Sequence, residues 1–373
     1  MQTKKLGFGL MRLPLNDKTN AGDIDVEQVK QMVDRFLERG FTYFDTAWMY
    51  CGFQSENATK TALVDRHPRD SYTLATKLHA GYIDFLEDRD RIFNEQLKKT
   101  GVTYFDYYLI HGIEASMLPK YEKLDCFRWL LDKKAAGLVK HAGFSFHGSA
   151  QLLDEILTKH PEMEFVQLQI NYLDWESEWV QSRRCYEVAV KHKKPVIVME
   201  PVKGGMLATP PTPVEQILKA SDPQASNASW AIRFAADLDG VVTVLSGMSS
   251  LEQMEDNLAC MKRFSGLTTA QKQTIVQAQE ALASIPLIPC TNCNYCAKVC
   301  PKNIGISGSF TAMNYLTLYS SREMAVNQEN WLVGRHGKNR ANECIKCGKC
   351  EQACPQHIHI RDELEQVSKV LLE

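Results

Sequence analysis

Eight cysteines after residue 289 have the type and spacing needed for metal chemistry. They form two groups, each with the pattern C-x2-C-x2-C-x3-C-P. Two-residue spacers let one tight loop offer three thiolates, and a fourth thiolate completes the set that a [4Fe–4S] cluster needs. A single C-x2-C would instead favour zinc or a thiol redox pair, an alternative that two complete copies disfavour. The sequence therefore predicts two [4Fe–4S] clusters, with ligands drawn from Cys290, Cys293, Cys296, Cys300, Cys344, Cys347, Cys350 and Cys354.

The repeated cysteine pattern is similar to that of bacterial two-cluster ferredoxins, in which the fourth cysteine of each group binds the other cluster. The similarity implies that Cys354 completes the first set and Cys300 the second. More than forty residues separate the two groups, and the segment SFTAMNYLTLYSS at 309–321 between them has a helical pattern. We expect a small, mostly helical ferredoxin-like domain.

A second set of reactive side chains follows three apolar runs in the first half of the sequence. Asp45, Lys77 and His111 each stand where a run ends, and Tyr50 comes five residues after Asp45. A tyrosine can protonate the oxygen of a carbonyl that receives a hydride, if a nearby ammonium lowers its pKa from about 10. Asp45 would pair with Lys77, and His111 would hydrogen-bond the same oxygen. Each residue alone is more often a solvated or packing residue, whereas the four together indicate carbonyl reduction.

These residues require elements that bring them to one place. Up to residue 265, short β-branched or aromatic runs alternate with stretches of helical periodicity. Eight repeats of this kind over about 260 residues fit a (β/α)8 TIM barrel. An open doubly wound sheet is the alternative, but LGFGLMRL after the first run lacks the G-x-G-x-x-G of that fold. The predicted strands are 5–11, 41–45, 71–76, 104–110, 138–144, 165–170, 195–199 and 240–245.

Helices are expected between these strands. Asp25 should cap the first, which ends before Gly40, and Ser226 should cap another. The ATPPTP stretch at 208–213 reads as a loop, and SIPLIP at 284–289 separates the barrel from the cysteine-rich part. We draw the domains as 1–275, the barrel, and 276–373, the cluster domain. The other helices are expected near 54–65, 84–99, 120–136, 149–159, 178–192, 226–238 and 250–262.

The motifs FDTAWMY…SE, ATK and YLIHG resemble the aldo-keto reductase family over residues 4–262. The resemblance implies that Tyr50 is the general acid, Lys77 its activator, Asp45 the partner of the lysine, and His111 the residue that orients the carbonyl. It also implies NADP(H) or NAD(H) across the barrel mouth. The residues that would contact this cofactor lie in GFSFHG, QLQIN, MEPVKGGML and LSGMSSLEQMEDN, and they are Ser145, Gln167, Pro201, Val202, Gly204, Ser246, Gly247, Gln253 and Asn257.

Three positions depart from the family pattern. Phe146 replaces an asparagine, Met199 replaces an aromatic residue that stacks on the nicotinamide, and Gln253 stands where many members have an arginine for the 2′-phosphate. Losing that arginine removes a bidentate phosphate contact, so the choice between NADP and NAD stays open. FMN in the same mouth is an alternative. Arg12, in GLMRLP, either reaches the mouth or forms an ion pair.

Composition excludes several other functions. A net charge of −2 creates no field for nucleic acid or an acidic membrane, and no apolar run suits a signal peptide or a membrane span. We expect a cytoplasmic oxidoreductase that acts on a small carbonyl compound and exchanges electrons with a carrier such as a ferredoxin or flavodoxin. Plain NAD(P)H-dependent reduction with structural clusters, and a redox-sensing regulatory subunit, are the alternatives. The basic residues near the second cysteine group serve as counter-charge or dock an acidic carrier; they are Arg335, Lys338, Arg340, Lys346 and Lys349.

Overall fold

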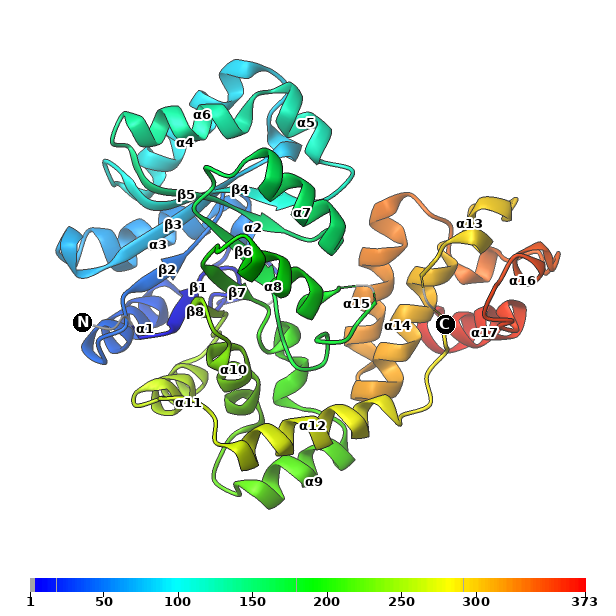
Figure 1. Cartoon of the computed structure of the whole chain (residues 1–373). Helices are drawn as coiled ribbons and strands as arrows, with labels where there is room; N and C mark the ends of the chain where they lie inside the picture. Colours follow the sequence, from blue (N-terminus) through cyan, green and yellow to red (C-terminus); the bar gives the residue numbers. More distant parts are fainter. Residues whose placement is uncertain (1–3, 18, 179, 291) are drawn as a thin grey trace. The chain divides into compact units, whose positions relative to one another are not determined.

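Eight parallel strands close into a barrel in the order in which they occur along the chain (Figure 1). The structure is a computed structural model that describes residues 4–17, 19–178, 180–290 and 292–373. The last strand pairs with the first, which closes the ring. The predicted barrel is therefore confirmed, and the open doubly wound sheet is wrong. The strands are β1 (Leu6–Gly9), β2 (Tyr43–Asp45), β3 (Thr73–His79), β4 (Phe105–Ile113), β5 (Val139–Phe146), β6 (Phe165–Gln169), β7 (Val196–Met199) and β8 (Val241–Ser246).

Three strands run past their predicted C-terminal ends by two or three residues: β3, β4 and, by two residues, β5. β3 continues to His79 and β4 to Ile113, so Lys77 and His111 lie inside strands rather than beyond their ends. In the sequence, polar residues end the apolar runs. The backbone pairing of β3 with β4 nevertheless continues through these residues, as the pairing of His79 with His111 shows. The error arose because a polar side chain on the inner face of a barrel reads as a strand end.

Inside the barrel, a layer of polar side chains lies next to a layer of apolar side chains, on the side of the C-terminal ends of the strands. Side chains from six strands form a buried cluster that includes Tyr43, Ala75 and Leu109. Successive side chains in a strand point to opposite faces, so residues two positions further on point inward as well. Those positions are Asp45 and Lys77 on β2 and β3, and the equivalent positions on β4 and β6 are His111 and Gln167. Because every second side chain of a strand points inward, these polar side chains all lie at one end of the barrel.

The helices of the barrel follow the expected alternation, with local differences. Asp25 caps α1, where its carboxylate accepts a hydrogen bond from the Gln28 N–H at 3.0 Å, and Ser226 caps α10. The helix expected at 120–136 is two helices, because Asp125 between them has a φ of 47°. The bounds are α1 (Val26–Glu38), α2 (Tyr50–Phe53), α3 (Ser55–Thr59), α4 (Leu86–Thr100), α5 (Leu118–Lys123), α6 (Cys126–Ala135), α7 (Ala150–Lys159), α8 (Ser182–Lys191), α10 (Asn227–Asp237) and α11 (Leu251–Met261).

Two helices between residues 209 and 283 were not predicted. α9 (Thr212–Ser221) begins inside the Pro-rich stretch that reads as a loop, and α12 (Thr269–Ala283) follows the last barrel helix. Pro213 lies in the first turn of α9, where proline is tolerated because its missing N–H would have no helical partner. Short 3-10 or π segments complete the secondary structure at η1 (Lys60–Val64), η2 (Arg69–Ser71), η3 (Ala80–Tyr82), η4 (Lys203–Ala208), η5 (Gly334–His336), η6 (Ala341–Glu343) and η7 (Ser368–Leu372).

The chain divides into two compact units, and the second consists of 209–217 and 277–373. Its helices pack on a small core of its own, with Phe310, Ala325 and Leu364 at the centre. The helix predicted at 309–321 is confirmed as α14. No helix in the described parts of the chain is long and apolar enough to cross a bilayer. The remaining helices are α13 (Tyr295–Val299), α14 (Ile306–Tyr319), α15 (Arg322–Leu332), α16 (Lys349–Gln352) and α17 (Ile360–Val367).

Candidate functional site

Lys77 and Asp45 form a buried ion pair at the C-terminal end of the barrel. Lys77 Nζ lies 2.6 Å from Asp45 Oδ1 and donates a second hydrogen bond to the Thr46 carbonyl at 2.7 Å. The two side chains are only 1% and 3% exposed. Burial alone would lower the pKa of Lys77, but the Asp45 carboxylate, together with hydrogen bonds to Asp45 and Tyr50, raises it above its usual value. The ammonium is therefore fixed in position and permanently charged at neutral pH.

Tyr50 sits beside this ammonium because of an unusual backbone. It begins α2, and Cys51, Gly52 and Phe53 after it all have left-handed φ angles of 49°, 57° and 69°. Such angles are uncommon for residues other than glycine. They turn the chain sharply, and the Tyr50 ring centroid lies 4.9 Å from Lys77 Nζ. Sequence reasoning missed this turn, for which Gly52 was the only signal.

The pKa of Tyr50 differs from the expectation. Burial raises it above its ordinary value, and the charge of Lys77 and its hydrogen bond oppose that rise without reversing it. The prediction that the neighbouring ammonium makes the phenol more acidic than usual is therefore wrong for the protein alone, because desolvation outweighs the ammonium. The phenol therefore stays protonated at neutral pH.

His111 completes the group as a neutral imidazole. Its ring centroid lies 5.9 Å from that of Tyr50. Burial lowers the pKa of His111 well below its ordinary value, and the positive charge of Lys77 adds to the effect. His111 Nδ1 is buried and has no hydrogen-bond partner among the described residues. His79, which was not predicted, packs against it with ring centroids 5.3 Å apart. The alternation Lys77, His79 along β3 was the available signal.

Ser145 and Gln167, expected to hold a nicotinamide, are register partners on β5 and β6. The Ser145 hydroxyl accepts a hydrogen bond from the Gly112 N–H at 2.7 Å, so its own proton remains available to donate. Gln167 is 2% exposed, and within the described chain its Oε1 has no partner. A buried amide oxygen without a partner fits a ligand that carries an N–H group, as a carboxamide does. Phe146, in place of the usual asparagine, is buried.

The predicted adenosine-side residues gather at the end of β8. Asn257 Nδ2 donates to Ser246 Oγ at 2.7 Å, which joins α11 to the strand. Gly247 follows Ser246 directly. Gln253 Oε1 accepts from the Ser249 N–H at 2.8 Å, so this side chain fixes the turn before α11. The group is preformed, but Gln253 supplies no positive charge.

The turn after β7 carries the remaining expected residues. Pro201 is buried, Val202 is half-buried, and Gly204 is exposed with a φ of 65°. Arg12 forms an ion pair with Glu200, with 3.1 Å between Nη2 and Oε1. A Cβ added at Gly204 would lie 3.1 Å from the same Nη2. Arg12 was expected either to reach the barrel mouth or to form an ion pair. The structure contains the ion pair, and the Arg12 guanidinium lies against the turn after β7.

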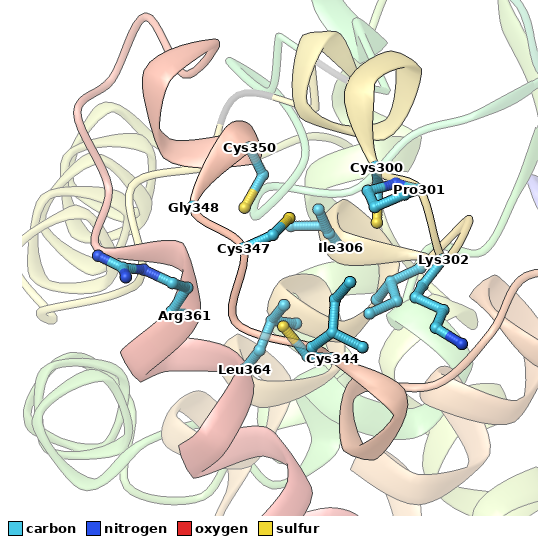
Figure 2. A pocket seen from close by; sticks show the side chains of 12 residues that line it. Cys300, Pro301, Lys302, Ile306, Cys344, Cys347, Gly348, Cys350, Arg361 and Leu364 are labelled. Carbon is cyan, nitrogen blue, oxygen red and sulfur yellow. The ribbon is translucent and has the colours of Figure 1, made fainter.

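The eight cysteines line two separate spaces in the second unit. We call the space lined by Cys290, Cys293, Cys296 and Cys354 the first cluster site. The second cluster site is lined by Cys300, Cys344, Cys347 and Cys350. Figure 2 shows the four sulfurs of the second site pointing toward the same space. The structure thus brings the cysteines together in the crossed combination.

The cluster sites suit a large, soft metal group. Among the described residues, no three His, Cys, Asp or Glu side chains converge on a point for a single ion. The cysteines instead surround their spaces, and Ile306, Phe310 and Leu364 supply apolar walls. Four thiolates around an apolar space are the donor set of an iron–sulfur cluster. Burial raises the pKa of Cys296 to about 11, so this thiol would lose its proton on binding metal.

The basic residues near the second cysteine group are partly neutralised. Lys346 pairs with Glu365 at 2.7 Å, and Arg340 pairs with Glu329 at 3.4 Å. Arg335 lies over the Trp331 ring, 4.9 Å from its centroid. The predicted basic surface is therefore less positive than its sequence suggests.

Both units point to oxidation–reduction chemistry. A closed barrel with a tyrosine next to a buried ammonium, in one chain with two four-cysteine sites, fits an oxidoreductase that carries an iron–sulfur domain. A model of the aldo/keto reductase family matches residues 5–280. The chain therefore belongs to the aldo/keto reductase family. A model of the 4Fe-4S dicluster domain matches residues 289–359.

Solved structures share the barrel. The holo form of aldo-keto reductase AKR11C1 from Bacillus halodurans is 22% identical, covers 74% of this chain and 91% of its own, and has a TM-score of 0.59. An aldo-keto reductase from Klebsiella pneumoniae in complex with NADPH is 17% identical, covers 73% of this chain and 90% of its own, and has a TM-score of 0.57. At these identities the likeness establishes the fold.

Proposed function

We propose that this protein reduces a carbonyl, or a related polarised bond, of a small substrate at the barrel mouth, and that its cysteine-rich domain exchanges electrons with a carrier. We divide the two functions between residues 1–275 and 276–373. The observation that carries the proposal is the buried Lys77 ammonium, 2.6 Å from Asp45 and 4.9 Å from the Tyr50 ring centroid. Charged groups with perturbed pKa values gather at catalytic sites, and an ammonium beside a phenol stabilises the phenolate that remains when the phenol gives up its proton.

In this mechanism Tyr50 is the general acid. When a hydride equivalent reaches the carbonyl carbon, negative charge develops on the oxygen, and the Tyr50 hydroxyl donates its proton there. Lys77 stabilises the phenolate that remains, and Asp45 holds Lys77 in place. His111, neutral because of its lowered pKa, donates a hydrogen bond that orients the carbonyl oxygen. Solvent then returns a proton to Tyr50.

A nicotinamide at the mouth would supply the hydride. Ser145 and Gln167 would hold its carboxamide, because one offers a hydroxyl proton and the other a buried oxygen without a partner in the described chain. Pro201, Val202 and Gly204 would line its pyrophosphate, and Ser246, Gly247, Gln253 and Asn257 its adenosine end. Since Gln253 carries no charge, we expect only weak preference for NADP(H) over NAD(H). The Klebsiella pneumoniae structure, with its bound NADPH, supports a nicotinamide. FMN is the alternative group for this mouth.

Two [4Fe–4S] clusters would let the cysteine-rich domain act as an electron store. Reduction of a carbonyl to an alcohol takes two electrons and two protons, and each cluster holds one electron. Cys290, Cys293, Cys296 and Cys354 would bind one cluster, and Cys300, Cys344, Cys347 and Cys350 the other. A ferredoxin or flavodoxin is the carrier class that this chemistry fits. Anaerobically purified protein should contain about eight iron atoms per chain; much less iron, with zinc in its place, would refute two clusters.

The test of the barrel chemistry is Tyr50→Phe. General acid catalysis contributes about 10²–10⁴-fold, so reduction of a panel of small aldehydes and quinones should fall by that factor. Tyr186→Phe, which removes a hydroxyl bonded to the Asp239 carbonyl on the outer helix layer, is the matched control and should keep full activity. Equal activity in both variants would refute Tyr50 as the acid.

The electron source separates the proposal from plain NAD(P)H-dependent reduction with structural clusters. The assay compares NADPH, NADH and a chemically reduced viologen as donors, in the parent protein and in Cys347→Ser. If the clusters feed the barrel, the variant loses viologen-driven reduction. If they are structural, NADPH-driven reduction is the only activity and survives in folded Cys347→Ser protein. Flavin peaks in the visible spectrum of fresh protein would identify FMN.

A further inference from the structure

The two cluster sites are alike in most properties that set a reduction potential. Each has one buried cysteine, one exposed cysteine and two of intermediate exposure. Each also has a backbone N–H near its leading sulfur: the Lys346 N–H donates to Cys344 Sγ at 3.4 Å, and the Asn292 N–H donates to Cys290. Cluster potentials depend on solvent exposure, hydrogen bonds to sulfur and nearby charge. Exposure and hydrogen bonding are matched, so charge is left to distinguish the sites.

Charge differs sharply between the sites. The first cluster site is lined by cysteines and neutral residues, among them Asn294, Phe310 and Gln356. The lining of the second includes Lys302 and Arg361. Figure 2 shows Lys302 on one side of the second space and Arg361 beside the Gly348 turn on the other.

The two-residue spacers of the cysteine loops show the same difference, whereas the three-residue spacers contain Lys298 in the first group and Glu351 in the second. In the second group, lysines occupy one position of each two-residue spacer, at 346 and 349, whereas the same spacers of the first group contain only neutral residues. Three carboxylates partly offset these cations: Glu351 pairs with Arg361 at 2.8 Å, Glu365 pairs with Lys346, and Asp362 lies close enough to attract both cations. No carboxylate of the described residues pairs with Lys302 or Lys349. The second site therefore keeps an excess of positive charge.

We propose that the two clusters have unequal potentials, and that the cluster in the second site is the one reduced first. The inference rests on the proposed function, because it needs both clusters. Adding an electron makes a cluster more negative, and Lys302 and Arg361 stabilise that state in the second site only. Ile306 lines both spaces, so the sites share a wall. An electron that enters at either site is therefore expected to be found, at equilibrium, mainly on the cluster in the second site.

A potentiometric titration of the full, anaerobically purified chain, followed by electron paramagnetic resonance, tests this order. Arg361→Gln should make the first-reduced signal harder to reduce, because it removes a cation and leaves Glu351 unpaired. Glu351→Gln should make the same signal easier to reduce. We expect a change of about three- to tenfold in the ratio of reduced to oxidised cluster at fixed potential, and tenfold corresponds to about 59 mV for one electron. Arg335→Gln, which alters a cation that lines neither site, should move neither signal.

The outcomes separate the inference from the function on which it rests. Opposite shifts of the first-reduced signal in the Arg361 and Glu351 variants support it. Shifts confined to the last-reduced signal, or equal shifts of both signals, overturn it while leaving two clusters in place. Iron content far below about eight atoms per chain would remove the clusters themselves and the proposed function with them. Because the Arg361–Glu351 pair lies at the surface, with side chains 45% and 20% exposed, neither variant should prevent folding.

Discussion

Removing both members of the Lys77–Asp45 pair should destabilise the barrel by less than the sum of the losses caused by removing each member alone. The atoms are 2.6 Å apart and almost fully buried. At an effective dielectric constant of about 20, their Coulomb attraction is about 6 kcal/mol. Asp45→Asn leaves a buried ammonium without a counter-charge, and Lys77→Met leaves a buried carboxylate. Part of the lost attraction is recovered by relaxation and water, so each single variant should lower the free energy of unfolding by about 3–5 kcal/mol.

The double variant Asp45→Asn/Lys77→Met removes both charges and should cost less than the sum of the single variants by at least about 2 kcal/mol. Urea unfolding followed by tryptophan fluorescence measures the effect, because five of the six tryptophans precede residue 276. Asp132→Asn is the control, since its pair with Arg128 at 3.1 Å is 72% and 63% exposed and should contribute no more than about 0.5 kcal/mol. Additive losses at Asp45 and Lys77, or losses no larger than the control, would refute the reasoning.

Three further outcomes follow from the barrel. The free energy of unfolding should fall as the pH drops below about 6.5, because the unfolded chain then binds a proton that the buried His111 imidazole, with its lowered pKa, does not bind. His111 should contribute up to about 1.4 kcal/mol per pH unit to this fall. Urea titrations of a His111→Phe variant at several pH values should show a smaller fall in the free energy of unfolding per pH unit. Gly143→Ala should destabilise the protein by about 1–3 kcal/mol or more, because a Cβ there would lie 2.5 Å from the Phe165 carbonyl oxygen. Gly112→Ala is the comparison, since its cost comes only from a φ of 64°. Thermal melting should show a larger fall in stability for Gly143→Ala than for Gly112→Ala. Asp25→Ala should cost about 1 kcal/mol by loss of the α1 cap, as judged by the urea midpoint, and an unchanged midpoint would contradict that role.

The barrel could be predicted from the sequence because its signals are local and repeated. Eight apolar runs and the helical spacing between them located every strand, usually within two residues at each end, and Asp25 and Ser226 identified two helix starts. The cysteine spacing indicated the cluster domain in the same way. In each case, the determinant lies within a few neighbouring residues.

The missed features depend on contacts between distant segments or on backbone angles. The left-handed turn at Cys51–Phe53 is held by its surroundings against the preference of those residues, so composition gives little warning of it. The sign of the Tyr50 pKa shift depends on how deeply the phenol is buried, which spacing along a chain does not reveal. The Arg12–Glu200 pair joins β1 and β7 loops that are far apart in sequence. Only the folded barrel brings these segments together.

The interleaved cysteines also constrain how the protein is made. The first cluster site draws three of its lining cysteines from 290–296, but the fourth is Cys354, and the second draws on Cys300. Neither site is whole until the ribosome has passed both loops and the helical hairpin of α14 and α15 between them. Insertion of metal during synthesis would therefore meet incomplete ligand sets for as long as that hairpin is being made. With clusters bound as proposed, the second site can be completed only after Cys350 has been made, and the first only after Cys354.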